Sequence, residues 1–286
     1  MLRLSDRMLE DLRVRNYSPE TQNAYVDRVA KFVAHFGNKP PARLGPEQVR
    51  SYQVFLVEKK KCSWTMLNQT VCALRFFYRT TLGQDWTIRH IPYAKGEKKL
   101  PVVLSHREME RLLEAAANMR DLSMILLGYS AGLRVSEIAN IQVRDIDSDR
   151  MTIHVRRGKG RKDRTVTLSP VLLAVARQHW LDARPENFLF PGAKRQRPIA
   201  VSSIQRMVRR TAKAAGIKKQ VSPHTLRHTF ATHHLEGGTD LPTLQLLLGH
   251  TSLRSTFIYL HVSRDKISAA KTPLELLTDL DLSQDE

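Results

Sequence analysis

The chain has 286 residues and a mass of 32.8 kDa, a length that favours two domains at roughly 150 residues each. Its 42% hydrophobic and 26% charged residues indicate a globular protein with a buried core and exclude a disordered chain. The formal net charge is +18 at pH 7. Such an excess of lysine and arginine predicts a polyanionic partner, with nucleic acid first among the candidates.

The cysteine count and the hydropathy pattern bear on the compartment. Cys62 and Cys72 are too few for a zinc quartet or a disulfide framework, so reduced cytosolic thiols are expected. No apolar run approaches the roughly 18 residues of a membrane span. Charged residues also interrupt the N-terminal segment where a signal peptide needs an apolar core. We therefore expect a cytoplasmic, nucleoid-associated protein without a membrane segment.

Helix breakers and charge divide the chain into four expected segments. These are a helical DNA-clamp domain (1–87), a basic linker (88–101), a second domain (102–271) and an acidic tail (272–286). The net charge is +8 over residues 1–95 and +15 over residues 96–271. Two basic domains joined by a basic linker suit a clamp around duplex DNA.

The first domain is expected to be a bundle of about four helices. Ser18 and Pro19 form an N-cap and first-turn pair, and apolar residues follow at helical spacing until Gly37. Pro46 opens another helix, and a further one begins near Trp64. We interpret the aromatic residues of this domain as core rather than as platforms for stacking bases.

The second domain is expected to be mainly helical with one small β-hairpin. A capping box, Ser105 to Glu108, opens its first helix. Apolar residues alternate over 151–155 and 166–168, on either side of a glycine-containing turn. The turn is strongly basic and is either a solvated tip or a DNA contact through Arg156, Arg157, Arg161, Lys162 and Arg164. A basic helix face, spaced to follow phosphates, adds Arg206, Arg209, Arg210 and Lys213.

Two segments carry residue types suited to phosphate chemistry. Arg134 follows a helix-ending glycine, and the carboxylate of Glu137, three residues later, is placed to hold its guanidinium. His224 and Arg227 are also three residues apart, in a helix that Pro223 opens. They share a face near the helix N-terminus, which attracts phosphate.

A third segment follows the predicted end of a later helix. Gly249 ends that helix and leaves His250 at an exposed corner, and Tyr259 lies nine residues further on. In this order, over residues 100–270, the three segments and the basic hairpin resemble the tyrosine recombinase, or phage integrase, family. The resemblance implies an active site formed by Arg134, Lys159, His224, Arg227, His250 and Tyr259, with Glu137 supporting the first arginine. Lys162 is an alternative to Lys159.

The chemistry that the resemblance implies needs these residue types. Two guanidinium groups hold the developing charge on a phosphodiester with paired donors. A tyrosine hydroxyl with a pKa near 10 needs a base, for which His224 is the candidate. Lys159 is the expected general acid for the departing 5′ oxygen, and His250 is expected to donate a hydrogen bond to the phosphate. No step needs a metal or a nucleotide, so no cofactor is expected.

Other histidines lie close to His224 in the sequence. His228, His233 and His234 suggest a metal site, but a zincin helix needs glutamate at the position of Thr225. Metal binding is therefore not expected, and we interpret His228 as a structural histidine.

The function implied by the resemblance is site-specific DNA recombination through a 3′-phosphotyrosyl intermediate, serving integration or excision of a mobile element. Integron-like capture and dimer resolution remain open as roles. The family also implies duplex DNA with an inverted-repeat core site as partner, a tetramer in the synapse, and docking of the tail (272–286) on a neighbouring subunit. The alternatives are a DNA-relaxing topoisomerase of the type that reseals the same strand, and a non-catalytic DNA-binding protein.

Overall fold

The computed structural model describes residues 3–84, 93, 100–156 and 163–260. The chain divides into two compact units, Met1–Lys98 and Lys99–Glu286. Both are mainly helical, and the second contains a small antiparallel sheet, so the predicted fold class is confirmed. Most of the predicted linker, the tip of the hairpin and the acidic tail lie outside the described residues. None of the described helices has the length and hydropathy needed to cross a membrane.

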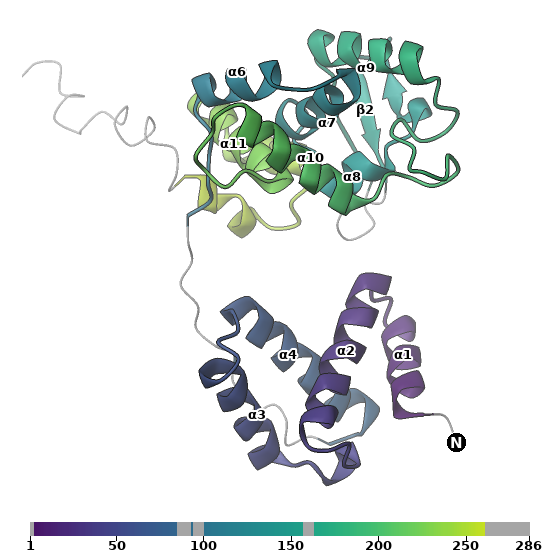
Figure 1. The fold of residues 1–286 in the computed structure, drawn as a ribbon, viewed down its shortest axis with the longest axis vertical. Coiled ribbons are helices and arrows are strands. Elements are labelled where there is room, and N and C mark those ends of the chain that lie inside the picture. The colour runs from purple at the N-terminus through teal and green to yellow at the C-terminus, as the bar shows by residue number, and fades with distance from the viewer. Residues whose placement is uncertain (1–2, 85–92, 94–99, 157–162, 261–286) are drawn as a thin grey trace, which may run out of the picture. The chain divides into compact units, whose positions relative to one another are not determined.

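The first unit is a bundle of helices (Figure 1), whose apolar faces form one buried core. Ser18 and Ser63 cap two of them, each accepting a backbone N–H from three residues later at 3.3 Å. Phe32 and Tyr78 are fully buried, which confirms that these aromatics form core. The Tyr78 hydroxyl donates to the carbonyl of Leu44 at 2.9 Å, so its polar atom is satisfied. The elements are α1 (Leu4–Val14), α2 (Pro19–His35), η1 (Pro41–Arg43), α3 (Pro46–Glu58), α4 (Trp64–Phe76) and the π-helical turn η2 (Phe77–Thr81).

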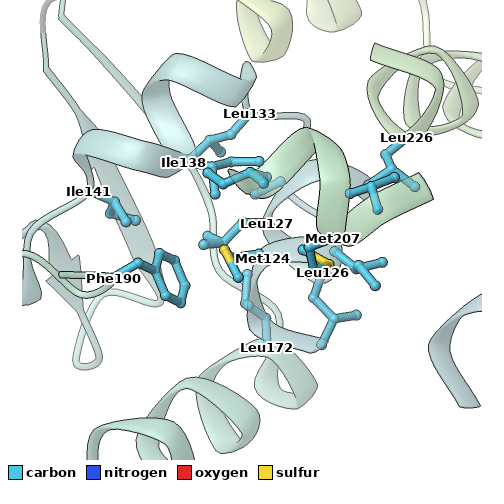
Figure 2. Close-up of a cluster of buried hydrophobic side chains, with 14 of the residues drawn as sticks. Met124, Leu126, Leu127, Leu133, Ile138, Ile141, Leu172, Phe190, Met207 and Leu226 are labelled. Carbon is cyan, nitrogen blue, oxygen red and sulfur yellow. The ribbon is translucent and has the colours of Figure 1, made fainter. Parts of the chain in front are cut away.

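The second unit is built around one central helix, α7, which packs against α6, α8, α9, α10 and α11. Figure 2 shows Met124 and Leu127 of α7 among buried side chains that include Leu172, Met207 and Leu226 from three surrounding helices. The helices are α6 (His106–Glu114), α7 (Met119–Tyr129), α8 (Val135–Asn140), α9 (Pro170–Ala183), α10 (Val201–Ala214), α11 (Pro223–Glu236) and α12 (Leu241–Leu248), with short turns η3 (Val143–Asp145), η4 (Leu253–Ser255) and η5 (Phe257–Tyr259).

The predicted hairpin forms β2 (Thr152–Val155) and β3 (Arg164–Thr167), and a two-residue strand, β1 (Ile146–Asp147), extends it into a three-stranded sheet of order β1-β2-β3. Ile153 pairs with Val166, and both side chains are buried. At the other end of the pairing, Val155 faces Arg164. This register places Arg164 at the first position of β3, at the turn end of the hairpin.

The segment between α7 and α8 passes very close to α11. Gly132 has a φ of +62°, and a Cβ atom there would lie only 2.6 Å from Cε1 of Phe230. Glycine is required at this position for both reasons. The close approach brings Arg134, two residues later, beside the N-terminal half of α11.

Candidate active site

Arg134 is held by Glu137 at the start of α8. The Glu137 carboxylate accepts the Arg134 backbone N–H at 2.8 Å and its guanidinium Nη1 at 2.8 Å. The other guanidinium nitrogen, Nη2, donates to the carbonyl of Gly249 at 3.2 Å. The pairing expected from the three-residue spacing is therefore present, and it fixes both the backbone and the side chain of Arg134.

Arg227 lies in the second turn of α11 and is only 4% exposed. Its guanidinium donates to the carbonyls of Gly132 and Leu248. Burial and the charge of Arg134 lower the pKa of Arg227 to about 9, which still leaves it protonated at neutral pH. Arg227 is thus a buried cation that donates to backbone carbonyls. It lies close enough to Arg134 for the two charges to interact.

Arg164 is a third arginine in the same cluster. It donates to both carboxylate oxygens of Glu137 at 2.8 Å, and its Nε donates to the carbonyl of Leu247 at 3.2 Å. The sequence analysis placed Arg164 among the DNA contacts of the hairpin. The structure instead commits its guanidinium to Glu137, because the side chain of Arg164, at the turn end of β3, points into the protein and is only 11% exposed.

The C-terminus of α12 is bound by all three arginines. The carbonyls of its last residues accept hydrogen bonds in turn: Leu247 from Arg164, Leu248 from Arg227, and Gly249 from Arg134. Helix C-termini carry unpaired carbonyls and partial negative charge, which guanidinium groups satisfy. Gly249 has a φ of +59° and ends the helix as predicted. The arginine cluster therefore sets where the chain leaves α12 towards His250 and Tyr259.

Glu137 is the shared counter-ion of this cluster and is 9% exposed. Burial alone raises the pKa of the Glu137 carboxyl, but the hydrogen bonds and charges of Arg164 and then Arg134 outweigh it and lower the pKa to about 2. The carboxylate is therefore ionised throughout the physiological range. Three guanidinium groups and one carboxylate leave a net charge of +2 in a small, largely buried volume.

Tyr259 lies in η5 and is 2% exposed. Its hydroxyl lies 3.0 Å from Nδ1 of His228, one turn after His224 on α11. Burial raises the pKa of Tyr259, against the opposing effect of the Arg227 and Arg134 charges. The hydroxyl is thus protonated at rest, within electrostatic reach of the arginine pair.

Two further histidines of the predicted site, His250 and His224, have different surroundings. The His250 ring is nearly parallel to the Tyr259 ring, with centroids 6.5 Å apart, and its Nδ1 lies 3.0 Å from the Thr256 hydroxyl. Burial, Arg227 and Arg134 lower the pKa of His224, in that order. The charges of both arginines thus act on His224, while the histidine that contacts Tyr259 is His228, which the sequence analysis treated as structural.

Several of the predicted DNA contacts have protein partners. Arg156 pairs with Asp145 at 2.5 Å, and Arg210 pairs with the buried Asp121 at 3.0 Å while 68% of its side chain stays exposed. Arg206, Arg209 and Lys213 are exposed along α10. The remaining predicted residues fall on the turn outside the described range: Arg157, Lys159, Arg161 and Lys162.

The other histidines of α11 have structural partners. His233 lies 3.0 Å from the Tyr129 hydroxyl and 3.0 Å from the Leu104 carbonyl, and its ring stacks on His106. His234 lies 3.1 Å from the Thr239 hydroxyl. Within the described ranges, no group of three or more His, Cys, Asp or Glu side chains has the arrangement of a metal site.

Comparison with known proteins identifies the family. Residues 102–266 match the phage integrase family, and residues 4–88 match the phage integrase N-terminal SAM-like domain. The chain belongs to the phage integrase family. It is 42% identical over 278 residues to y4qK of Sinorhizobium fredii, described as an integrase/recombinase, with 97% of this chain and 90% of the relative covered. It is 34% identical to the tyrosine recombinase XerA of Pyrococcus horikoshii, covering 91% and 90% of the two chains.

Solved structures share the fold of this integrase-family chain. A crystal structure of XerA recombinase is 34% identical, with a TM-score of 0.54 and coverage of 93% of this chain and 95% of that one. XerH bound to its palindromic difH substrate shows the same fold at 22% identity, with a TM-score of 0.71 and coverage of 95% and 85%. The expectation of a site-specific tyrosine recombinase is thus confirmed at the level of the family.

Proposed function

We propose that this tyrosine recombinase cuts duplex DNA with Tyr259 as the nucleophile and rejoins the cut strand to a partner duplex. The observation that carries the proposal is the net charge of +2 formed by Arg134, Arg164, Arg227 and Glu137 near a buried tyrosine hydroxyl. Attack of a tyrosinate on a phosphodiester gives a phosphorane with two negative charges. A preorganised cluster of opposite charge stabilises that transition state more than the singly charged ground state.

The roles divide according to what each arginine already binds. Arg164 donates both terminal nitrogens to the Glu137 carboxylate, and its charge is not among those that act on Tyr259, so it is assigned as a positioning residue. Arg134 and Arg227 each donate to backbone carbonyls, and the charges of both act to lower the pKa of Tyr259. They are therefore assigned to the non-bridging phosphate oxygens. His250 is assigned as a further hydrogen-bond donor to the phosphate. Lys159 is assigned as the acid for the 5′ oxygen, on the resemblance alone.

The proposed partner is duplex DNA carrying a core site with inverted repeats, bound by a tetramer in the synapse. XerH has been solved on its difH substrate, and lambda integrase has been solved as a dimer on a core site. The exposed cations of α10 and the +18 net charge support binding to DNA phosphates. Integration or excision of a mobile element is the proposed role, supported by the integrase/recombinase description of y4qK.

The test begins with the cleavage site. The wild-type chain is incubated with sheared DNA from its source genome, and covalent adducts are trapped in detergent and sequenced. We expect cut sites within inverted repeats of about 11 base pairs, one helical turn. The mapped site is then placed on two plasmids. A joined plasmid dimer supports recombination, relaxation of single plasmids without exchange supports the topoisomerase alternative, and the absence of any adduct supports a non-catalytic binding protein.

A further inference from the structure

The Tyr259 hydroxyl has a histidine partner that the family resemblance does not assign. His228 Nδ1 and Tyr259 Oη are 3.0 Å apart, a full hydrogen bond between α11 and η5. The two rings are 5.6 Å apart and inclined at 53°, so the contact is made through the polar atoms rather than by stacking. Tyr259 is buried, which limits the other partners open to its hydroxyl.

The protonation states of the two side chains make His228 the acceptor in this hydrogen bond. Burial, with smaller effects from His224 and Arg227, lowers the pKa of His228 to about 4, so its ring is neutral at neutral pH. Burial raises the pKa of Tyr259, so the phenol keeps its proton. Of the two possible directions of this hydrogen bond, the favoured one has the phenol O–H as donor and the unprotonated ring nitrogen as acceptor. The stable arrangement therefore points the tyrosine proton at Nδ1.

We propose that His228, rather than His224, receives the proton of the Tyr259 hydroxyl during strand cleavage and returns it during ligation. This inference rests on the nucleophile role proposed above for Tyr259. In cleavage the Oη–H bond breaks and an Nδ1–H bond forms, the Oη–P bond forms and the P–O5′ bond breaks. The 5′ oxygen takes its proton from the separate general acid. In ligation the 5′ hydroxyl gives its proton to the former general acid as the P–O5′ bond forms, the Oη–P bond breaks, and His228 returns its proton to the departing tyrosinate.

We expect bound DNA to favour the transfer to His228. The charged and titratable groups that face His228 are His224 and Arg227 on its own helix and Tyr259 on η5, while Arg134 and His250 lie beside Tyr259. A phosphodiester held by Arg134 and Arg227 cancels part of their positive charge. The charge of Arg227 is one of the effects that lower the pKa of His228, after burial and His224, so an anion bound at Arg227 raises the basicity of the His228 ring. The proton acceptor is thus weak in the free protein and becomes stronger when substrate is in place.

The position of His224 suits a different task. It lies in the first turn of α11, where Arg227 and Arg134 both lower its pKa. Its ring centroid is 6.3 Å from that of His228, and the histidine whose hydrogen bond to Tyr259 is observed is His228. His224 is therefore assigned as a hydrogen-bond donor to the phosphate, together with the arginines.

The test compares His228→Asn with His224→Asn in the full-length chain. Asparagine can place Oδ1 near the position of Nδ1 and accept the tyrosine hydrogen bond, but it cannot take a proton. The substrate is a nicked duplex carrying the mapped core site, from which the cut fragment diffuses away. We expect His228→Asn to bind this duplex within a few-fold of wild type and to cleave it about 10² to 10⁴ times more slowly, the range of a lost general base.

The pH profile separates proton transfer from packing. The cleavage defect of His228→Asn shrinks as pH rises from 7 to 9.5, because the fraction of molecules whose Tyr259 has lost its proton to solvent increases with pH. The defect of His224→Asn stays constant over this range. His234→Asn, which alters a histidine on the same helix that contacts Thr239, serves as the folding control. Wild-type cleavage by His228→Asn, or a defect that does not change with pH, overturns the inference. A wild-type chain that forms no adduct instead overturns the proposed function.

A second measurement does not depend on turnover. The Tyr259→Phe variant cannot react, so its histidines can be titrated by NMR with and without the same duplex. We expect the pKa of His228 to rise by about one pH unit or more when the duplex binds. An unchanged pKa contradicts the mechanism by which DNA strengthens the base.

Discussion

Replacing Glu137 with glutamine should destabilise the second unit by about 3 kcal/mol at pH 7. Each carboxylate oxygen accepts two donors at 2.8 Å, one from Arg134 and one from Arg164. A glutamine in either amide orientation turns one acceptor into a donor that faces two donors. The pKa of Glu137 falls from 4.5 to about 2 on folding, and about 1.4 kcal/mol for each pH unit of difference gives the predicted loss. Breaking a buried ion pair typically costs a similar amount.

The sign of the pH dependence follows from the lowered pKa. The stabilisation by the carboxylate is complete above the unfolded pKa and is lost as pH falls towards the folded pKa. Between pH 7 and pH 3.5 the difference in unfolding free energy between wild type and Glu137→Gln should narrow by about 1.4 kcal/mol. Above pH 6 it should stay constant.

Urea unfolding followed by tryptophan fluorescence measures this difference. Replacing Trp64 and Trp86 with phenylalanine leaves Trp180 of α9 as the reporter of the second unit. Glu110→Gln, which neutralises an exposed carboxylate on α6, is the matched control and should change stability by less than about 0.5 kcal/mol. A loss below about 1 kcal/mol for Glu137→Gln, or a difference that does not narrow at low pH, refutes the account of the cluster.

Three further predictions test other parts of the site. Gly249→Ala should lower stability by about 1 to 3 kcal/mol in a thermal melt, because its φ is +59° and a Cβ would lie 2.7 Å from Cδ of Arg164; an unchanged melting temperature contradicts this. Strand cleavage should survive excess EDTA, since arginines supply the charge at the phosphate; loss of cleavage that Mg²⁺ restores argues against it. Lys159→Ala should cleave an ordinary duplex about 10² to 10⁴ times more slowly but cleave a 5′-bridging phosphorothiolate at nearly the wild-type rate; equal defects on both substrates redirect the assignment to Lys162.

Local signals in the sequence account for most of the fold. Ser105 and Glu108 form the predicted capping box, with hydrogen bonds of 2.8 and 3.2 Å. Alternating apolar residues predict β2 and β3, and Gly249 marks the end of α12. These features depend on residues within a few positions of one another. Strand β1 has only two residues, too few to produce a recognisable alternation.

Contacts between distant residues account for what the sequence did not reveal. Arg164 is one of many cations around the hairpin turn, and only the register of β3 turns its side chain towards Glu137, 27 residues earlier. His228 shares a helix face with His224, a signal that was available, but its partner Tyr259 lies 31 residues later. No spacing rule links residues across two helices and a turn. The motif therefore predicts which residue types form the site, whereas the contacts among them depend on the fold.

The nucleophile is the central claim, and the most direct measurement is the mass of the trapped adduct. The chain is reacted with the nicked core-site duplex, digested with nuclease and trypsin, and its peptides are sequenced by mass spectrometry. We predict a nucleotide phosphate on the peptide of residues 255–264, whose single tyrosine is Tyr259, and its complete loss in Tyr259→Phe with DNA affinity within a few-fold of wild type. An adduct on another peptide, or one that persists in Tyr259→Phe, contradicts the account.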